Sequence, residues 1–259
     1  MKTNQKTNSK AKKADKTMNE LYSGLGDVKN DFRNYNLVNL VKTYVKGKKV
    51  LDIGCGSGYL LSQIQSSIKR KGDTITGFKR DVYGIEPNQK LIEIAKKNHP
   101  TIDIRQGYGE DIQQFTEKFD TITMLDVLEH IEDDAKQVQI VKEKLNKNGR
   151  FIIVVPAYQG LYGKRDEQMG HYRRYNKESL AKLLRKNGYK IIHQRYWNMI
   201  GVPLYYFYEK ILQKPLNTKL RKQGQKNIMN KTLGIWMQKI ENNINMGFGL
   251  SLITIAKRK

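Results

Sequence analysis

A short apolar run ending in alternate glycines lies at residues 45–65, VKGKKVLDIGCGSGYLLSQIQ. Its glycines are Gly54, Gly56 and Gly58. The apolar pattern predicts a buried strand over 48–54 and a helix over 59–68. A glycine turn between such elements is typical of nucleotide-like cofactor sites, because a bare backbone lets a ligand approach the start of the helix.

Strands and helices alternate after this turn. The spacing of apolar residues predicts further strands over 82–87, 102–107, 119–127, 149–156, 190–197 and 250–257. Helices are expected within 21–45 and over 89–98, 133–146 and 176–188, and the polar segment 69–81 is interpreted as a loop insertion. The pattern indicates an α/β fold with a doubly wound, seven-stranded, mostly parallel sheet.

The chain divides into three parts by composition. Residues 1–17 are polar and lysine-rich, and we expect a disordered basic arm there. Residues 18–198 and 250–259 carry the alternating elements and form the main domain. Residues 199–249 interrupt the alternation and are expected to form a helical insertion before the last strand.

The formal net charge of +23 indicates an anionic neighbour, either nucleic acid, an acidic membrane surface or a phosphorylated substrate. The alternative is a lysine-rich solvated surface. The single cysteine excludes an intramolecular disulfide, and the basic start lacks the apolar segment of a secretory signal. These features predict a cytoplasmic protein, with peripheral contact to the inner face of a membrane left open.

Two carboxylates indicate which cofactor the glycine turn binds. Asp52 ends the first strand, and the glycines follow in GxGxG spacing instead of the dinucleotide GxGxxG. A carboxylate there repels a pyrophosphate and suits a ligand with positive charge, such as the ammonium and sulfonium of S-adenosylmethionine. Glu86, at the end of the next strand and before Pro87, can accept hydrogen bonds from ribose hydroxyls.

Further polar residues follow the third and fourth strands. Either Glu110 or Asp111 can accept a hydrogen bond from an adenine amino group, and the other would cap the helix that follows. Leu125 and Asp126 end the fourth strand, where the methionine part of the cofactor should lie. Cys55, inside the glycine turn, is interpreted as a small packing residue.

Four motifs in this order resemble those of the class I S-adenosylmethionine-dependent methyltransferases. They are VLDIGCGSG, YGIEPN, GYGEDI and FDTITMLDVLEHIED, and LNKNGRFIIVVP is similar to the family's fifth strand. The resemblance covers residues 45–195 and the last strand. It implies a Rossmann-like sheet of order 3-2-1-4-5-7-6 with an antiparallel seventh strand, and S-adenosylmethionine as cofactor. No metal site is predicted. The implied cofactor residues are Asp52, Gly54, Cys55, Gly56, Gly58, Glu86, Pro87, Glu110, Asp111, Leu125 and Asp126.

The acceptor site is expected in residues 156–180, just after the fifth strand. Substrate binding is assigned to Tyr158, Arg173, Arg174 and Tyr175, because arginines hold anionic groups through paired hydrogen bonds. The alternative pairs both arginines with carboxylates of the chain. The segment GHYRRY resembles a branch of small-molecule methyltransferases, some of them in lipid-linked glycan or quinone pathways.

Two histidines are candidates for a general base. His171 belongs to the GHYRRY segment and His130 to LEHIED, a position where similar O-methyltransferases have Glu-His. Each has a structural alternative: His171 would cap or fill space, and His130 would orient its loop.

These features predict O-methylation of a small-molecule or lipid-linked acceptor. The fourth strand is not followed by NPPY or DPPY, and the only cysteine lies in the glycine turn, which argues against methylation of adenine, amide nitrogen or pyrimidine carbon. An RNA methyltransferase is the alternative, and a non-enzymatic cofactor-binding scaffold is a third. In the insertion, aromatic residues precede a basic run, which indicates a lid or a contact with an anionic membrane. That run comprises Lys210, Lys214, Lys219, Arg221 and Lys222.

Overall fold

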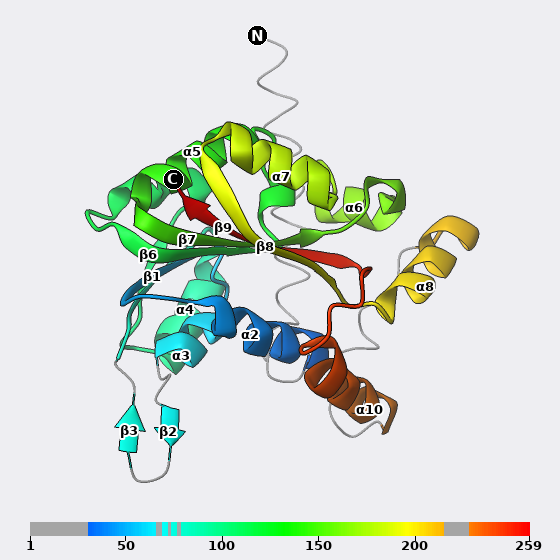
Figure 1. The fold of residues 1–259 in the computed structure, drawn as a ribbon, viewed down its shortest axis with the longest axis horizontal. Coiled ribbons are helices and arrows are strands. Elements are labelled where there is room, and N and C mark those ends of the chain that lie inside the picture. The colour runs from blue at the N-terminus through cyan, green and yellow to red at the C-terminus, as the bar shows by residue number, and fades with distance from the viewer. Residues whose placement is uncertain (1–30, 66–68, 72–73, 77–78, 215–227) are drawn as a thin grey trace.

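A seven-stranded sheet forms the centre of the computed structural model, which describes residues 31–65, 69–71, 74–76, 79–214 and 228–259 (Figure 1). Its order is β5-β4-β1-β6-β7-β9-β8, which confirms the predicted order 3-2-1-4-5-7-6. The last strand, β9, is antiparallel to both of its neighbours, and the other pairings are parallel. The strands are β1 (Lys49–Ile53), β4 (Asp81–Glu86), β5 (Asp103–Gln106), β6 (Phe119–Leu125), β7 (Leu145–Pro156), β8 (Tyr189–Trp197) and β9 (Ser251–Arg258).

Helices cover both faces of the sheet (Figure 1). One face carries α2 (Phe32–Tyr44), α3 (Tyr59–Gln65) and α4 (Gln89–Asn98), and the other carries α5 (Asp134–Lys144) and α7 (Lys177–Lys186). Along β7 the buried side chains alternate between two apolar cores: Ile152 and Val154 join the first, whereas Ile153 and Val155 join the second. Continuous apolar strands are expected where a sheet is buried on both sides.

The carboxyl ends of the parallel strands share one edge of the sheet. Three segments follow the strands at this edge. They are the glycine turn after β1, the 3-10 turn η2 (Gly109–Gln114) after β5 and the short turn η3 (Leu128–His130) after β6. The loop after β7 contains η4 (Gln159–Leu161) and α6 (Lys164–Met169). In open α/β sheets ligands bind outside this edge, at the point where the strand order reverses.

Two local predictions are refined. The segment 69–81, interpreted as a loop, contains an antiparallel pair of short strands, β2 (Lys69–Lys71) and β3 (Thr74–Thr76). The first described helix begins at Phe32 because the side chain of Asp31 caps it, accepting hydrogen bonds from the N–H groups of Arg33 and Asn34. The arm predicted over 1–17 lies outside the described residues.

The described part of the insertion before β9 is largely helical, as predicted. It comprises α8 (Gly201–Tyr206), which continues as the π-helical turn η5 (Phe207–Ile211), and α10 (Ile228–Trp236), which continues as η6 (Met237–Glu241). The side chain of Trp197 fastens η6 to the end of β8 by donating to Oδ1 of Asn242 at 2.9 Å. In the part of the chain that the structure describes, no helix has the length and apolar character needed to cross a bilayer.

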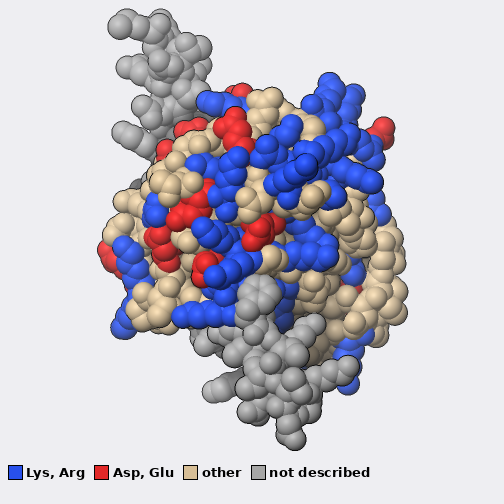
Figure 2. Space-filling model, turned by 60° about the vertical axis from the view of Figure 1, so that its left-hand side comes forward, with Lys and Arg blue, Asp and Glu red and all other residues tan. Residues whose placement is uncertain are grey.

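Basic residues are prominent on the side of the molecule opposite the ligand edge. Figure 2 brings the left-hand side of Figure 1 forward and shows Lys and Arg spread over it. The amino ends of the parallel strands lie on this side, and exposed lysines precede or begin several of them, or follow the last residue of antiparallel β9. These include Lys46, Lys48, Lys147, Lys186, Lys190 and Lys259.

Candidate functional site

The glycine turn has the backbone conformation that its sequence requires. Gly54, Gly56 and Gly58 have φ angles of 72°, 54° and 75°, in the left-handed region that glycine adopts without strain. A Cβ at Gly54 would lie 2.5 Å from Cγ2 of Val127, so Gly54 also permits close packing. A Cβ at Gly56 would meet no atom within 4 Å. The turn therefore presents bare backbone toward open space at its middle glycine.

Glu86 lies directly beside this backbone. Its Oε2 accepts a hydrogen bond from the N–H of Gly56 at 2.9 Å, and its Oε1 accepts one from the N–H of Asn88 at 3.0 Å. Burial raises the pKa of this carboxyl group, and the two backbone donors oppose the rise. Each oxygen keeps further lone pairs, so the carboxylate can also accept hydrogen bonds from a ligand.

Asp52 is buried at the same edge of the sheet, near the end of β1. It pairs with Gly84 of β4 and Thr123 of β6 in the sheet, and its Oδ1 accepts a hydrogen bond from the hydroxyl of Thr123 at 2.6 Å. Burial raises the pKa of Asp52 to about 7, against the effect of Thr123, and the neighbouring charge of Glu86 adds to the rise. Two acidic groups close enough to affect one another favour a cationic ligand between them.

Cys55 packs behind the turn. A Cβ at Gly84 would lie 2.6 Å from Sγ of Cys55, so this glycine makes room for the thiol in the core. The side chain is 7% exposed, and burial raises the pKa of the thiol well above its usual range. Any contact between Cys55 and a ligand at this edge would therefore come from its backbone.

The structure distinguishes the two acidic residues after β5. Oδ2 of Asp111 accepts the N–H of Tyr108 at 2.8 Å and so caps the start of η2. Glu110 is exposed and makes no such capping bond. Of the two residues, Asp111 is the cap, which leaves Glu110 as the candidate for the adenine amino group.

Asp126 forms an ion pair with another residue of the chain. It has a φ of 52°, and its Oδ2 lies 3.1 Å from Nη1 of Arg33. Leu125, at the end of β6, and Pro87, after β4, are both partly exposed at the ligand edge. Arg33 therefore bridges α2 to the end of β6 beside the predicted cofactor position.

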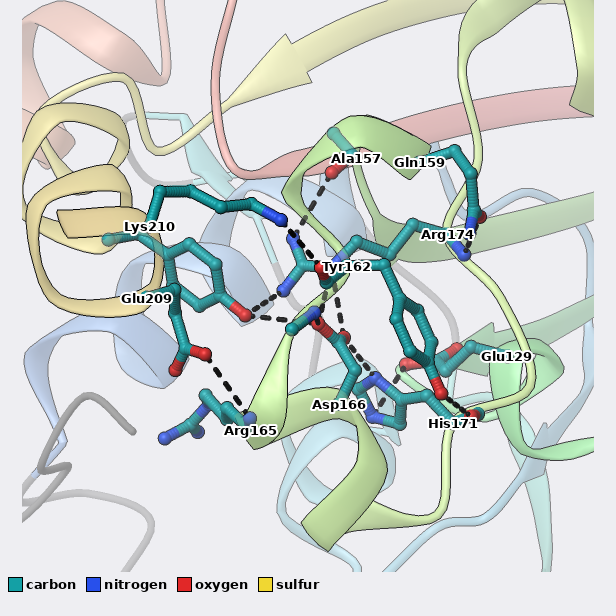
Figure 3. Close-up of polar contacts among 12 residues, drawn as sticks. Glu129, Ala157, Gln159, Tyr162, Arg165, Asp166, His171, Arg174, Glu209 and Lys210 are labelled. Carbon is teal, nitrogen blue, oxygen red and sulfur yellow. Dashed lines mark hydrogen bonds and ion pairs between the residues drawn. The ribbon is translucent and has the colours of Figure 1, made fainter. Parts of the chain in front are cut away.

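His171 belongs to a buried network in the loop after β7 (Figure 3). Its Nδ1 lies 2.7 Å from Oδ1 of Asp166, a carboxylate with no exposed surface. Nε of Arg174 donates to both oxygens of Asp166 at 2.9 Å, and the hydroxyl of Tyr205 donates to Oδ2 at 3.1 Å. Although burial opposes ionisation, the hydrogen bonds from His171 and Arg174 lower the pKa of Asp166 to about 2. Asp166 is therefore a fixed negative charge behind the imidazole.

The other nitrogen of His171 faces a second pair of residues. Nε2 lies 4.0 Å from Oε1 of Glu129, and the ring of His130 meets that of His171 edge to face with centroids 4.6 Å apart. Burial raises the pKa of Glu129 well above its usual range, and Asp126 adds to the rise. Burial and His171 lower the pKa of His130 to about 4. Near neutral pH, His130 is therefore uncharged, and burial disfavours the ionised form of Glu129.

These three residues also have the side chains of a metal site, which the sequence did not predict. Ligand atoms of Glu129, His130 and His171 lie within 4.8 Å of one another. Oε2 of Glu129 has no hydrogen-bond partner among the described residues. The cluster could therefore hold a cation.

The residues predicted to bind substrate are occupied by partners within the chain. Each nitrogen of the Arg174 guanidinium donates internally: Nε to Asp166, Nη1 to the carbonyl of Ala157 at 3.2 Å, and Nη2 to Tyr205. Nη1 of Arg173 lies 2.8 Å from Oδ2 of Asp134. Both arginines thus form ion pairs within the chain, as the alternative expects: Arg174 with the buried Asp166 of the same loop, and Arg173 with the half-buried Asp134 of α5.

The two predicted tyrosines also face the chain. Tyr175 is 4% exposed, and its hydroxyl donates to Oδ2 of Asp134 at 2.7 Å. The ring of Tyr158 stacks on Tyr196 with centroids 4.8 Å apart. A hollow of about 350 Å³ lies beside these residues, and Arg173, Arg174 and Tyr175 contribute to its wall. Its lining contains no residue of the glycine turn.

Sequence reasoning did not assign roles to Asp166, Glu129 and Tyr205. A signal for the first was present, because Asp166 precedes His171 by five positions within one short loop. Tyr205 comes from α8, far along the chain, and no spacing pattern connects it to the loop. Only the packing of α8 against α6 brings it there.

Comparison with known proteins agrees with this geometry. The sequence profile of the family described as "Methyltransferase domain" matches residues 30–194. The chain belongs to this methyltransferase family, and its fold is that of the class I S-adenosylmethionine-dependent enzymes. Family membership implies S-adenosylmethionine as the cofactor.

Individual relatives cover part of the chain. The "Ubiquinone biosynthesis O-methyltransferase" of Actinobacillus pleuropneumoniae is 38% identical over 108 residues, which are 40% of this chain and 43% of that protein. The chain thus matches less than half the length of this relative. Among solved structures, YcgJ of Bacillus subtilis aligns with a TM-score of 0.55 at 18% identity, covering 86% of this chain and 97% of its own. Magnesium protoporphyrin IX methyltransferase of Synechocystis, solved with bound SAH, aligns with a TM-score of 0.51 at 16% identity over 86% of this chain and 82% of its own.

Proposed function

We propose that this protein transfers the methyl group of S-adenosylmethionine to a hydroxyl of a small-molecule or lipid-linked acceptor, in the cytoplasm and at the inner face of the membrane. The observation that carries the proposal is the His171–Asp166 pair beside the ligand edge. A hydroxyl is a poor nucleophile until it loses its proton, so a positioned base is the feature that distinguishes transfer to oxygen from transfer to a free amine.

The residues of the glycine turn fit the cofactor. The open space over Gly56 leaves room for it, Glu86 can accept from the ribose hydroxyls, and Asp52 supplies negative charge toward its cationic end. When bound, the cofactor supplies a methyl group on a positively charged sulfur. The protein's contribution is to align the acceptor with that methyl group and to take the acceptor's proton.

His171 is the residue that takes the proton. The bond to Asp166 fixes the proton of neutral His171 on Nδ1, so Nε2 carries the free lone pair. The ring is 11% exposed, which leaves it within reach of a ligand at the surface. Because burial and His171 lower the pKa of His130 to about 4, His130 is a poor base near neutral pH and acts by positioning His171 through ring contact.

An RNA substrate receives less support. RNA binding needs basic residues that track the phosphate backbone into the site. Here many basic residues face the opposite side of the molecule, and the two arginines of the GHYRRY segment are paired with Asp166 and Asp134. The names of the curated relatives also favour an oxygen acceptor on a small molecule.

The test is incubation with S-adenosylmethionine labelled in its methyl group, together with separate lipid, metabolite, RNA and protein fractions. We expect label in the lipid or metabolite fraction, in a product that survives mild base as a methyl ether does. The Glu86→Ala variant should give no label. Label confined to RNA or protein would contradict the proposal, and transfer to no fraction would favour the scaffold alternative.

A further inference from the structure

The outer side of the α8–η5 segment exposes large apolar side chains at the ligand edge. Leu204, Phe207 and Ile211 are 48%, 46% and 59% exposed, and the adjoining Tyr206 and Leu212 are 52% and 42% exposed. These five residues are called the α8 patch below. In Figure 1 the segment stands out from the body of the molecule beside α6, on the side where the parallel strands end. An exposed apolar group of this kind marks a contact with another apolar surface.

The exposed charges of this segment are all positive. Among residues 203–214 the only acidic residue is Glu209, which is 5% exposed and whose Oε2 accepts the N–H of Arg165 at 3.3 Å. The exposed charges are those of Lys214 and of Lys210, whose ammonium is exposed but also donates to the carbonyl of Tyr162. A lipid bilayer with anionic headgroups matches this combination, because apolar side chains enter its interface while lysines meet its phosphates.

The inner side of the same segment holds the candidate base. Tyr205 is 3% exposed and donates to Asp166, which in turn holds His171. Nζ of Lys210 donates to the carbonyl of Tyr162 at 2.7 Å, and the hydroxyl of Tyr162 donates to the carbonyl of His171, also at 2.7 Å. One short helical segment thus carries apolar residues outward and contacts the His171 network inward.

We propose that the α8 patch docks on an anionic lipid surface and places the His171 site at that surface. The proposal deepens the proposed function, since it names the lipid-linked class of acceptor. A lipid-linked hydroxyl would then reach the site without leaving the bilayer. Such docking does not require a helix that crosses the bilayer, because the α8–η5 segment already presents its apolar side chains outward.

The test is flotation of the full-length protein with phosphatidylcholine vesicles, with and without phosphatidylglycerol. We expect binding that depends on phosphatidylglycerol and weakens with salt. The double variant Phe207→Glu/Ile211→Glu should lower the bound fraction at least about tenfold. Ile192→Glu, at a similarly exposed apolar residue of β8, is the matched control and should bind as the wild type does.

Three outcomes would overturn the proposal: no binding of the wild type to anionic vesicles, equal binding of the double variant, or a dimer of the wild type that the double variant abolishes. The last would assign the patch to a second copy of the chain. Calorimetric titration with S-adenosylmethionine, which should be unchanged in the double variant, shows that the variant is folded. Vesicle binding without methyl transfer would support the docking surface and refute the proposed activity. Methyl transfer without vesicle binding would support the activity and refute the docking surface.

Discussion

The hydroxyl of Tyr205 donates to Oδ2 of Asp166 at 3.1 Å, although 39 positions separate the two residues in the chain. Tyr205 belongs to the insertion, and Asp166 to the loop after β7. Through this bond the insertion fixes the carboxylate that orients His171. The candidate site is therefore shared between a loop of the sheet and the helical insertion before β9.

Replacing Tyr205 by Phe tests whether this bond positions the base. The variant removes the donor to Asp166 and the acceptor of Arg174, so we expect kcat to fall several-fold, to about a third to a tenth, with KM for the cofactor unchanged. The pH profile of kcat should also shift, which a purely structural role would not produce. Tyr206→Phe, at the exposed neighbour, is the control, and equal loss in both variants would refute a positioning role.

Replacing His171 by Asn tests the base itself. We expect kcat to fall by about 10²–10⁴-fold, the usual contribution of a general base, while the Kd for S-adenosylmethionine stays the same. His193→Asn is the control, because His193 belongs to β8 and its ring stacks on Tyr44 of α2. Turnover equal to that of the wild type would return His171 to a structural role.

The raised pKa of Asp52 predicts a pH dependence of cofactor binding. Only the ionised carboxylate attracts a cation, and in the free protein burial holds the pKa of Asp52 at about 7. Below pH 7 binding must first ionise this group, so the Kd should rise toward about tenfold per unit of pH as the pH falls. Calorimetry on Asp52→Asn should show weaker binding without this slope. A slope that persists in the variant would assign the titration to another group.

The same group predicts a change in stability. The pKa of Asp52 is about 7 in the folded protein and about 3.9 in an unfolded chain, so between these values the folded state holds the extra proton. Stability therefore falls as the pH rises from about 4 to about 7, and the loss remains above it. Because Asn cannot ionise, Asp52→Asn should raise the Tm of the cofactor-free protein at pH 8 and change it little at pH 4. Scanning calorimetry measures this, and a lower Tm at pH 8 would contradict it.

Alanine substitutions at two glycines of the turn distinguish an effect on cofactor binding from an effect on packing. Gly56→Ala and Gly54→Ala both place a Cβ at a positive φ, a strain of about 1–2 kcal/mol. Only the alanine at 54 also collides with Val127, so Gly54→Ala should lower Tm further. Gly56→Ala should instead act mainly on the Kd for S-adenosylmethionine, since its methyl group enters the open space. Equal losses of Tm in the two variants would contradict this assignment.

The sequence determined the sheet and its ligand edge. Strand lengths, helix starts and the order of motifs are local properties, so apolar spacing and the resemblance together predicted the order of all seven strands. The carboxylates of Asp52 and Glu86 were predictable for the same reason, because each directly ends a strand. The short pair β2–β3 was missed because its polar residues carry no apolar period.

Tertiary structure decided what each polar side chain of the long loop faces. Two adjacent arginines in GHYRRY have the same local signal, yet Arg174 is buried on Asp166 and Arg173 pairs with Asp134 on α5. Their partners come from different elements, and Tyr205 joins from a third. Local sequence fixes backbone conformation within a few residues, whereas a buried charge takes whichever distant group satisfies it when the layers pack. For this reason the sequence predicted the cofactor residues at the sheet edge, whereas only the tertiary structure showed the hydrogen-bond network around His171.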